Sequence, residues 1–271
     1  MLTDYHLHIE RGPYSLDWLQ RFINQGLAEG IGEFGFSEHC YRFTQAGHLL
    51  DNAWSAPRCT QDIADYIRLI TAAKASGLPV KLGIEVDYIP GKESEIGEFL
   101  ARYPFDFVIG SVHWLDDWGF DLEETLPRWQ KADIDAVYTR YFGVIHKAAQ
   151  SGLFDILGHL DLVKIYGFRP QQDLTDLYRQ TCAIIAASGC AIEVSTAGLR
   201  KKVGEIYPHP ALLSLCRSYD IPITLSSDAH APEQVGENFM QAVKLITDTG
   251  YTSLTTFANR VPKSVPLHAQ G

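Results

Sequence analysis

Two histidines two residues apart, His6 and His8, lie at the start of the chain and are its clearest candidates for chemistry. They belong to an apolar, strand-like run, in which alternate side chains point to the same side. Both imidazoles are therefore placed to bind one ion. Because an ion needs more than two ligands, we expect later segments of the chain to supply the others.

Residues that commonly bind metals follow most of the other strand-like runs. They are His39, Glu85, His113, His159, Asp228 and His230. In a parallel α/β fold the carboxyl ends of the strands form the functional rim, so these side chains are expected at one edge. A single histidine or acid there is more often a structural residue or a helix cap than a ligand. Their joint placement favours a metal centre.

The eight candidate ligands combine imidazole and carboxylate donors without sulfur. This donor set suits Zn²⁺, Mn²⁺ or Fe²⁺. Catalytic zinc usually keeps three protein ligands, so eight exceed what one ion needs. We therefore expect two or three divalent ions that share a bridging carboxylate.

Seven apolar runs alternate with helical patterns, which predicts parallel βα units. The runs are Leu2–His6, Glu33–Ser37, Val80–Val86, Phe107–Val112, Ile156–Gly158, Ala191–Val194 and Ile223–Ser226. Between them we expect, among others, a helix capped by Ser15, one that begins at Thr60 and a last one that Pro232 opens. Seven units without a low-complexity linker predict a single domain over residues 1–271. They favour a closed barrel, with an open doubly wound sheet as the alternative.

The composition narrows the classes of partner. With 23 Lys and Arg against 33 Asp and Glu, the formal net charge is −10, which disfavours nucleic acid bound by charge alone. Five cysteines without a CxxC pair indicate reduced thiols and a cytoplasmic protein. No signal-peptide pattern opens the chain, and no apolar segment approaches the roughly 20 residues that span a bilayer. We therefore expect no nucleic-acid or membrane partner.

The densest basic cluster follows the sixth run. Its Arg200 is expected to bind phosphate, because a planar guanidinium pairs with two oxygens, whereas Lys201 and Lys202 are expected to be solvated. Lys164 and Arg169, soon after the fifth run, are further candidates for anion binding.

Two connections, residues 40–58 and 114–133, are longer than βα turns need to be. Such connections are either substrate walls or packed surface excursions. His48, in the first of them, is a candidate substrate contact. We expect the three remaining histidines to be structural or solvated: His146, His209 and His268.

The order of these motifs resembles the polymerase and histidinol phosphatase (PHP) superfamily. Its motifs match His6-Leu7-His8, Glu38-His39, His113, His159 and Asp228-Ala229-His230. Within the superfamily the chain is most similar to the histidinol-phosphate phosphatases. The stretches that carry this likeness are residues 83–88, 110–114, 193–201 and 206–208.

The resemblance implies a distorted seven-stranded β/α barrel, similar to a TIM barrel, with three metal ions. The implied ligand sets are His6, His8, Glu85 and Asp228 for the first metal, Glu85, His113 and His159 for the second, and His39 and His230 for the third. The six residues of the first two sets are also expected to be catalytic. Many relatives have another histidine soon after the first pair. Here Glu10 is the expected substitute ligand.

The resemblance further implies hydrolysis of L-histidinol phosphate, a small phosphate monoester of histidine biosynthesis. A hydroxide that bridges two metals would attack phosphorus, while the third metal and Arg200 would offset the developing charge. Asp161 and a metal-bound water are candidates for protonating the leaving alkoxide. The side chains expected to receive the imidazole and ammonium groups are Tyr41, Trp114, Asp116 and Asp117.

Two other functions remain alternatives. Relatives trim DNA ends, so the chain is also a candidate phosphodiesterase, although a nuclease needs a basic or aromatic track for the nucleic-acid backbone. A metal-binding module without catalysis is the second alternative, and the intact set of ligands disfavours it.

Overall fold

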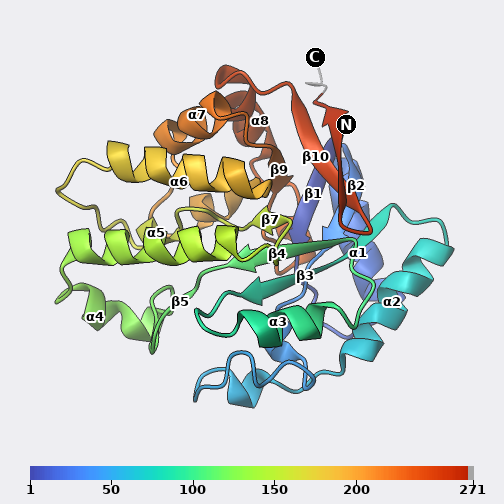
Figure 1. The fold of residues 1–271 in the computed structure, drawn as a ribbon. Helices are drawn as coiled ribbons and strands as arrows, with labels where there is room; N and C mark the ends of the chain where they lie inside the picture. Colours follow the sequence, from blue (N-terminus) through green and yellow to red (C-terminus); the bar gives the residue numbers. More distant parts are fainter. Residues whose placement is uncertain (268–271) are drawn as a thin grey trace.

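The seven apolar runs all form strands, which pair in parallel in the order of the chain. The computed structural model describes residues 1–267. Its barrel strands are β1 (Leu2–Leu7), β2 (Ile31–Phe36), β3 (Val80–Asp87), β4 (Phe107–Ser111), β7 (Ile156–Leu157), β8 (Ala191–Ser195) and β9 (Ile223–Ser226). Helices surround these strands (Figure 1). The predicted series of βα units is therefore confirmed.

The barrel closes where the end of β9 meets the end of β1. A parallel bridge joins Leu7 to Ala229, and the backbone N–H of His8 donates to the Ala229 carbonyl over 2.8 Å. Further down, Asp4 accepts a hydrogen bond from the backbone N–H of Ser227. The backbone N–H of Ala229 also donates to the His6 carbonyl over 3.2 Å, but β1 and β9 form no regular ladder, so the barrel is nearly closed and distorted, as the resemblance implied. The alternative of an open doubly wound sheet is wrong.

The helices are α1 (Leu16–Ala28), α2 (Ile63–Ala75), α3 (Glu93–Leu100), α4 (Leu126–Trp129), α5 (Ile134–Gln150), α6 (Thr175–Ser188), α7 (Pro210–Ser218) and α8 (Phe239–Asp248). Ser15 caps α1 as predicted, since its hydroxyl accepts a hydrogen bond from the Trp18 backbone. Two predicted starts are wrong. Asp62 caps α2, and Pro232 opens only a short 3₁₀ turn, because the chain takes positive φ values at Gly236 and Asn238.

A C-terminal hairpin, β10 (Ser253–Ala258) and β11 (Val261–Pro266), closes the amino end of the barrel. Its Phe257 packs against Tyr5 and Phe107 inside the barrel, and the Phe257 backbone N–H donates to the Tyr5 hydroxyl. At the same end, the backbone N–H of Arg260 donates to the carbonyl of Asp106, just before β4. Because the hairpin covers the amino end of the barrel, a functional site is expected at the carboxyl end of the strands.

No helix within residues 1–267 is both long enough and apolar enough to cross a membrane. His268 lies outside the described residues.

Candidate metal centre and its cavity

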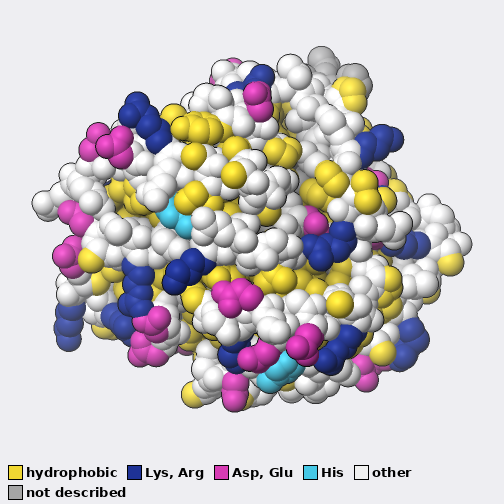
Figure 2. Space-filling model, in the orientation of Figure 1, with side chains coloured by type: hydrophobic (Ala, Val, Ile, Leu, Met, Phe, Trp, Pro, Cys, Tyr) yellow, Lys and Arg dark blue, Asp and Glu magenta, His cyan; other side chains and the backbone are white. Residues whose placement is uncertain are grey.

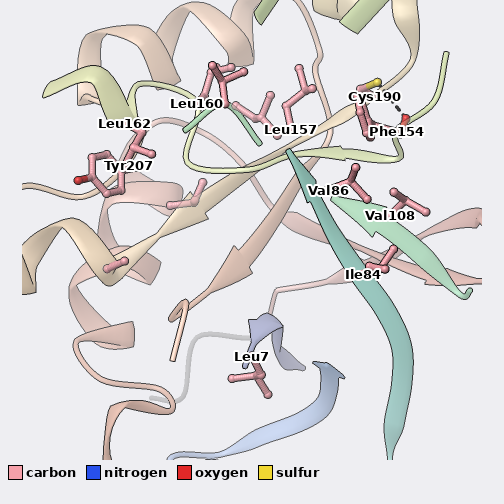
Figure 3. Packing of buried hydrophobic residues seen from close by; sticks show 14 of the residues in the cluster. Leu7, Ile84, Val86, Val108, Phe154, Leu157, Leu160, Leu162, Cys190 and Tyr207 are labelled. Carbon is pink, nitrogen blue, oxygen red and sulfur yellow. Dashed lines mark hydrogen bonds between the residues drawn. The ribbon is translucent and has the colours of Figure 1, made fainter. Parts of the chain in front are cut away.

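Alternation along β3 separates core residues from candidate ligands. Ile84 and Val86 point into the layer between barrel and helices, where Figure 3 shows them near Val108 of the neighbouring strand. Glu85 and Asp87 alternate with them and therefore point to the opposite side of the strand, toward the barrel axis. The same strand thus builds part of the core and part of the site.

Glu85 lies among five of the candidate histidines. Its Oε1 is 3.4 Å from Nε2 of His6, 3.2 Å from Nε2 of His159 and 3.7 Å from Nε2 of His113. Its Oε2 is 3.7 Å from Nε2 of His8 and 2.5 Å from Nδ1 of His39. The two oxygens thus face different imidazoles, which is the arrangement of a carboxylate that bridges ions.

The structure brings the candidate ligands together in groups whose donor atoms all lie within 4.8 Å of one another. The groups are His6, His8 and Asp228; Glu85, His113 and His159; His8, His39 and His230; and His8, Glu10 and Glu38. The first three resemble the three sets implied by the resemblance, except that Glu85 is not in the first group and His8 is also in the third. Glu10 lies beside that third group, and its Oε1 is 3.9 Å from Nε2 of His230.

The spacing of the donor atoms fits shared metal ions. Two ligands of a tetrahedral zinc, each about 2.0–2.1 Å from the ion, lie about 3.4 Å apart. The distance is 3.4 Å both from His6 Nε2 to Glu85 Oε1 and from His8 Nε2 to Asp228 Oδ1. Within residues 1–267, Nε2 of His6 and Nε2 of His8 are buried without a hydrogen-bond partner. Such groups are costly unless something else binds them, so the residues present fit divalent ions.

Two acidic residues that we did not select from the sequence orient the imidazoles. Nδ1 of His6 lies 2.6 Å from Glu193 Oε1, and Nδ1 of His113 lies 2.7 Å from Asp87 Oδ1. Donation from Nδ1 leaves Nε2 of each ring free to bind a metal. Alternation from Glu85 would have identified Asp87, and an acid inside the apolar β8 run would have pointed to Glu193.

Backbone geometry also positions candidate ligands. His159 and Asp228 have φ values of 24° and 50°, a left-handed conformation that is uncommon outside glycine. The His159 N–H donates to Glu193 Oε2 over 2.5 Å. The turn at Asp228 is held by Arg200, which donates to the carbonyl oxygens of Ser227 and Asp228 over 2.6 and 3.0 Å.

The buried charges of the centre stabilise one another. Burial alone would raise the pKa of Glu85, but His6 and the neighbouring imidazoles hold it well below its usual range. Asp228 is partly exposed at the cavity; its desolvation would raise its pKa, but His6 and His8 likewise hold that pKa well below normal. Burial disfavours protonated His8, yet its interactions with Asp228 and Glu38 raise its pKa to about 10. Glu85 and Asp228 are therefore ionised at neutral pH, as metal ligands must be.

A cavity of about 170 Å³ opens above the centre. Glu85, His159 and Asp228 are among the residues at its base. Both long connections line it. Tyr41 stacks on a candidate ligand, His39, with ring centroids 4.9 Å apart, and Trp54 packs edge-on against Trp114 across a centroid distance of 5.9 Å.

The predicted phosphate-binding residue, Arg200, does not line this cavity. Its guanidinium binds the two carbonyls at the end of β9 and also pairs with Glu237. Lys201 is exposed as expected, but it lines the cavity and is the one lysine or arginine among its lining residues.

The other predicted substrate contacts also lie outside the lining of this cavity. Nζ of Lys164 is buried 3.0 Å from the carboxylate of Asp161, and neither residue lines this cavity. Arg169 pairs with Glu205 at 2.5 Å. His48 belongs to the first long connection but does not reach the cavity.

Of the four side chains expected to receive the cationic groups of the substrate, only the two aromatic ones line the cavity. Tyr41 and Trp114 line the cavity, but Asp116 and Asp117 are exposed and pair with Arg140 and Arg128. Asp121, which we did not select, lines the cavity instead, and burial raises the pKa of its carboxyl.

Comparison with known proteins agrees with this geometry. A family model described as "PHP domain" matches residues 4–197, which is more than half of the chain. The chain belongs to the PHP family. The predicted resemblance is thereby confirmed, and Asp228 and His230 of this PHP protein lie beyond the matched range.

The similar curated proteins are full-length relatives of this PHP protein. A probable histidinol-phosphatase of Deinococcus radiodurans is 35% identical over 257 residues, which cover 94% of this chain and 96% of that one. A histidinol-phosphatase of Bacillus subtilis is 30% identical, with coverages of 86% and 95%. A similar fold occurs in the crystal structure of histidinol phosphate phosphatase from Lactococcus lactis, which was complexed with zinc, L-histidinol and phosphate. The TM-score is 0.75 at 22% identity, and the match covers 97% of this chain and 98% of that one. At that identity the last comparison shows a shared fold.

Proposed function

We propose that this PHP protein is a metal-dependent phosphatase that hydrolyses L-histidinol phosphate to L-histidinol and phosphate. The observation that carries the proposal is the convergence of imidazoles and carboxylates around Glu85 at the base of a small-molecule cavity. The names of relatives that are 35% and 30% identical over nearly their whole length support the choice of substrate.

The candidate ligands divide among two or three ions. His6, His8 and Asp228 would hold one ion, and His113 and His159 a second, with Glu85 between the two. The third group, His8, His39 and His230 with Glu10 beside it, would complete the centre. Divalent ions bound there would lower the pKa of water toward 7 and offset the charge on the phosphoryl group. Zinc, manganese and iron all suit these donors.

The remaining residues position these ligands and the substrate. Glu193 and Asp87 fix the rings of His6 and His113 with Nε2 toward the ions. Arg200 holds the turn that aims Asp228. Lys201, which lines the cavity, would take the role first expected of Arg200, and its ammonium would attract the phosphoryl oxygens as a point charge.

Phosphate release from L-histidinol phosphate, with and without added Mn²⁺ or Zn²⁺, tests the proposal. Replacing His113 by Ala should lower turnover by more than the roughly 10–100-fold typical of changes around a metal ligand, with loss of bound metal. His48→Ala is the matched control, because this histidine does not line the cavity. Full turnover by the His113 variant would refute the proposal.

Phosphodiester hydrolysis has less support. On the face shown in Figure 2, acidic side chains are interspersed among the basic ones, and no continuous basic track runs across it. A direct comparison of L-histidinol phosphate with a single-stranded oligonucleotide should show hydrolysis of the monoester alone.

A further inference from the structure

One acidic side chain of the cavity has no role in the proposed metal centre. Of the four acids that line the cavity, Glu85 and Asp228 are candidate ligands and Asp87 orients His113. The fourth is Asp121. Its Oδ1 is buried and accepts no hydrogen bond from any residue in the described range 1–267. The cavity thus contains a carboxylate oxygen that lacks a partner.

The backbone on both sides of Asp121 is fixed. The N–H of Phe120 donates to the His113 carbonyl over 3.2 Å, and its own carbonyl accepts a 2.7 Å hydrogen bond from Trp129. The Asp121 carbonyl accepts a 2.6 Å hydrogen bond from the Tyr166 hydroxyl. The backbone that carries the carboxylate is therefore held in place before any ligand binds, which reduces the entropy that binding must remove.

The surroundings of Asp121 favour a cation over water. Leu122, Leu162 and Ile165 line the same cavity, and Trp114 adds an aromatic face. A carboxylate beside apolar side chains gains most from a positively charged partner, since little solvent is present to stabilise its charge. An aromatic ring attracts cations as well.

We propose that Asp121 binds a cationic nitrogen of the leaving group, the ammonium or imidazolium of an amino-alcohol phosphate, and so determines substrate specificity. This inference rests on the proposed function: with the phosphoryl group at the candidate ligands of the base, the leaving group would extend toward the wall of the cavity. Asp116 and Asp117 do not compete for the cation, as each already pairs with an arginine at the surface.

The test compares the variants Asp121→Asn and Asp117→Asn on three esters: L-histidinol phosphate, glycerol 2-phosphate and 4-nitrophenyl phosphate. Asp121→Asn should lose roughly 10–100-fold in kcat/KM on L-histidinol phosphate, the value of a hydrogen bond to a charged group. Hydrolysis of the two uncharged leaving groups should be unchanged. Asp117→Asn should behave as wild type on all three, because its side chain is exposed.

Two other patterns would overturn the inference. An equal loss on all three esters would assign Asp121 to the metal centre or the fold. A loss on both alkyl esters that spares 4-nitrophenyl phosphate would make Asp121 the proton donor to the leaving alkoxide, since nitrophenolate leaves without protonation.

Inhibition by L-histidinol separates this inference from the proposed function. With 4-nitrophenyl phosphate as the substrate, L-histidinol should inhibit wild type and Asp117→Asn equally, and Asp121→Asn roughly 10–100-fold more weakly. Wild type that hydrolyses the nitrophenyl ester but not L-histidinol phosphate would refute the proposed function alone. Equal inhibition of Asp121→Asn and wild type would refute the role of Asp121 alone.

Discussion

At Glu85, a single side chain connects the groups of candidate ligands. Its two oxygens face different imidazoles, and both lie at the base of the cavity. The sequence was sufficient to identify Glu85, because an acid near the end of an apolar strand is unusual. The same reasoning missed Asp87, the last residue of that strand, and Glu193 inside β8, because their importance comes from the imidazoles they orient.

Glu85→Gln should reduce metal binding while leaving the fold intact. The amide keeps the shape of the side chain but removes the charge that bridges the ions, so we expect phosphate release to fall by at least about 100-fold. Metal analysis of the purified variant should show fewer bound ions than wild type. Glu98→Gln, at an exposed position, is the control. A variant with wild-type metal content would refute the bridging role.

Glu193→Gln should weaken metal binding without removing any ligand. An amide binds the His6 ring less firmly and in either tautomer, which typically costs 10–100-fold in metal affinity. Titration of the metal-free variant with Zn²⁺ measures this directly. An unchanged affinity would contradict the positioning role of Glu193.

At the scale of elements, the strands were predictable and several connections were not. Runs of buried apolar residues define the barrel strands, because every strand is covered on the outside by helices. The short strands β5 (Trp114–Leu115) and β6 (Trp118–Gly119), and the largely exposed β11, carry no such signal. The direction of Arg200 depends on two carbonyls at the end of β9, which local sequence cannot reveal.

The loop after β8 therefore supplies Lys201 rather than Arg200 to the cavity. Lys201→Ala should raise KM for the phosphate ester about three- to tenfold, a modest effect because solvent screens an exposed ammonium. Lys202→Ala is the control from the same loop. Steady-state kinetics and inhibition by inorganic phosphate would reveal the change, and identical effects of the two substitutions would contradict the assignment.

At the scale of the whole molecule, the barrel brings the ionisable candidate ligands together at its carboxyl end. The chain has a net charge of −10, but these ligands include several histidines, and a bound metal would keep those histidines unprotonated. Interactions with nearby carboxylates overcome the effect of burial and raise the pKa values of His8 and His113 to about 10. The order of the motifs predicted the family, and the alternation of apolar runs with helical patterns predicted the barrel. A single domain and a cytoplasmic location stay predictions.

These shifts predict that the metal-free protein loses stability as pH rises. A histidine with a raised pKa stabilises the fold while protonated, and this contribution disappears between its unfolded value near 6.5 and its folded value. Because His230 has a lowered pKa and acts in the opposite direction near 6.5, the clearest window is from about pH 7.5 to 10. Thermal unfolding should show a steeper decline for metal-free than for metal-loaded protein. Parallel declines would contradict this.

Anomalous diffraction from crystals grown with Zn²⁺ or Mn²⁺ tests the central claim most directly, because it locates ions independently of activity. The account predicts at least two strong peaks. One should lie among His6, His8 and Asp228, and one among Glu85, His113 and His159. A single peak, no peak, or peaks away from Glu85 would contradict it.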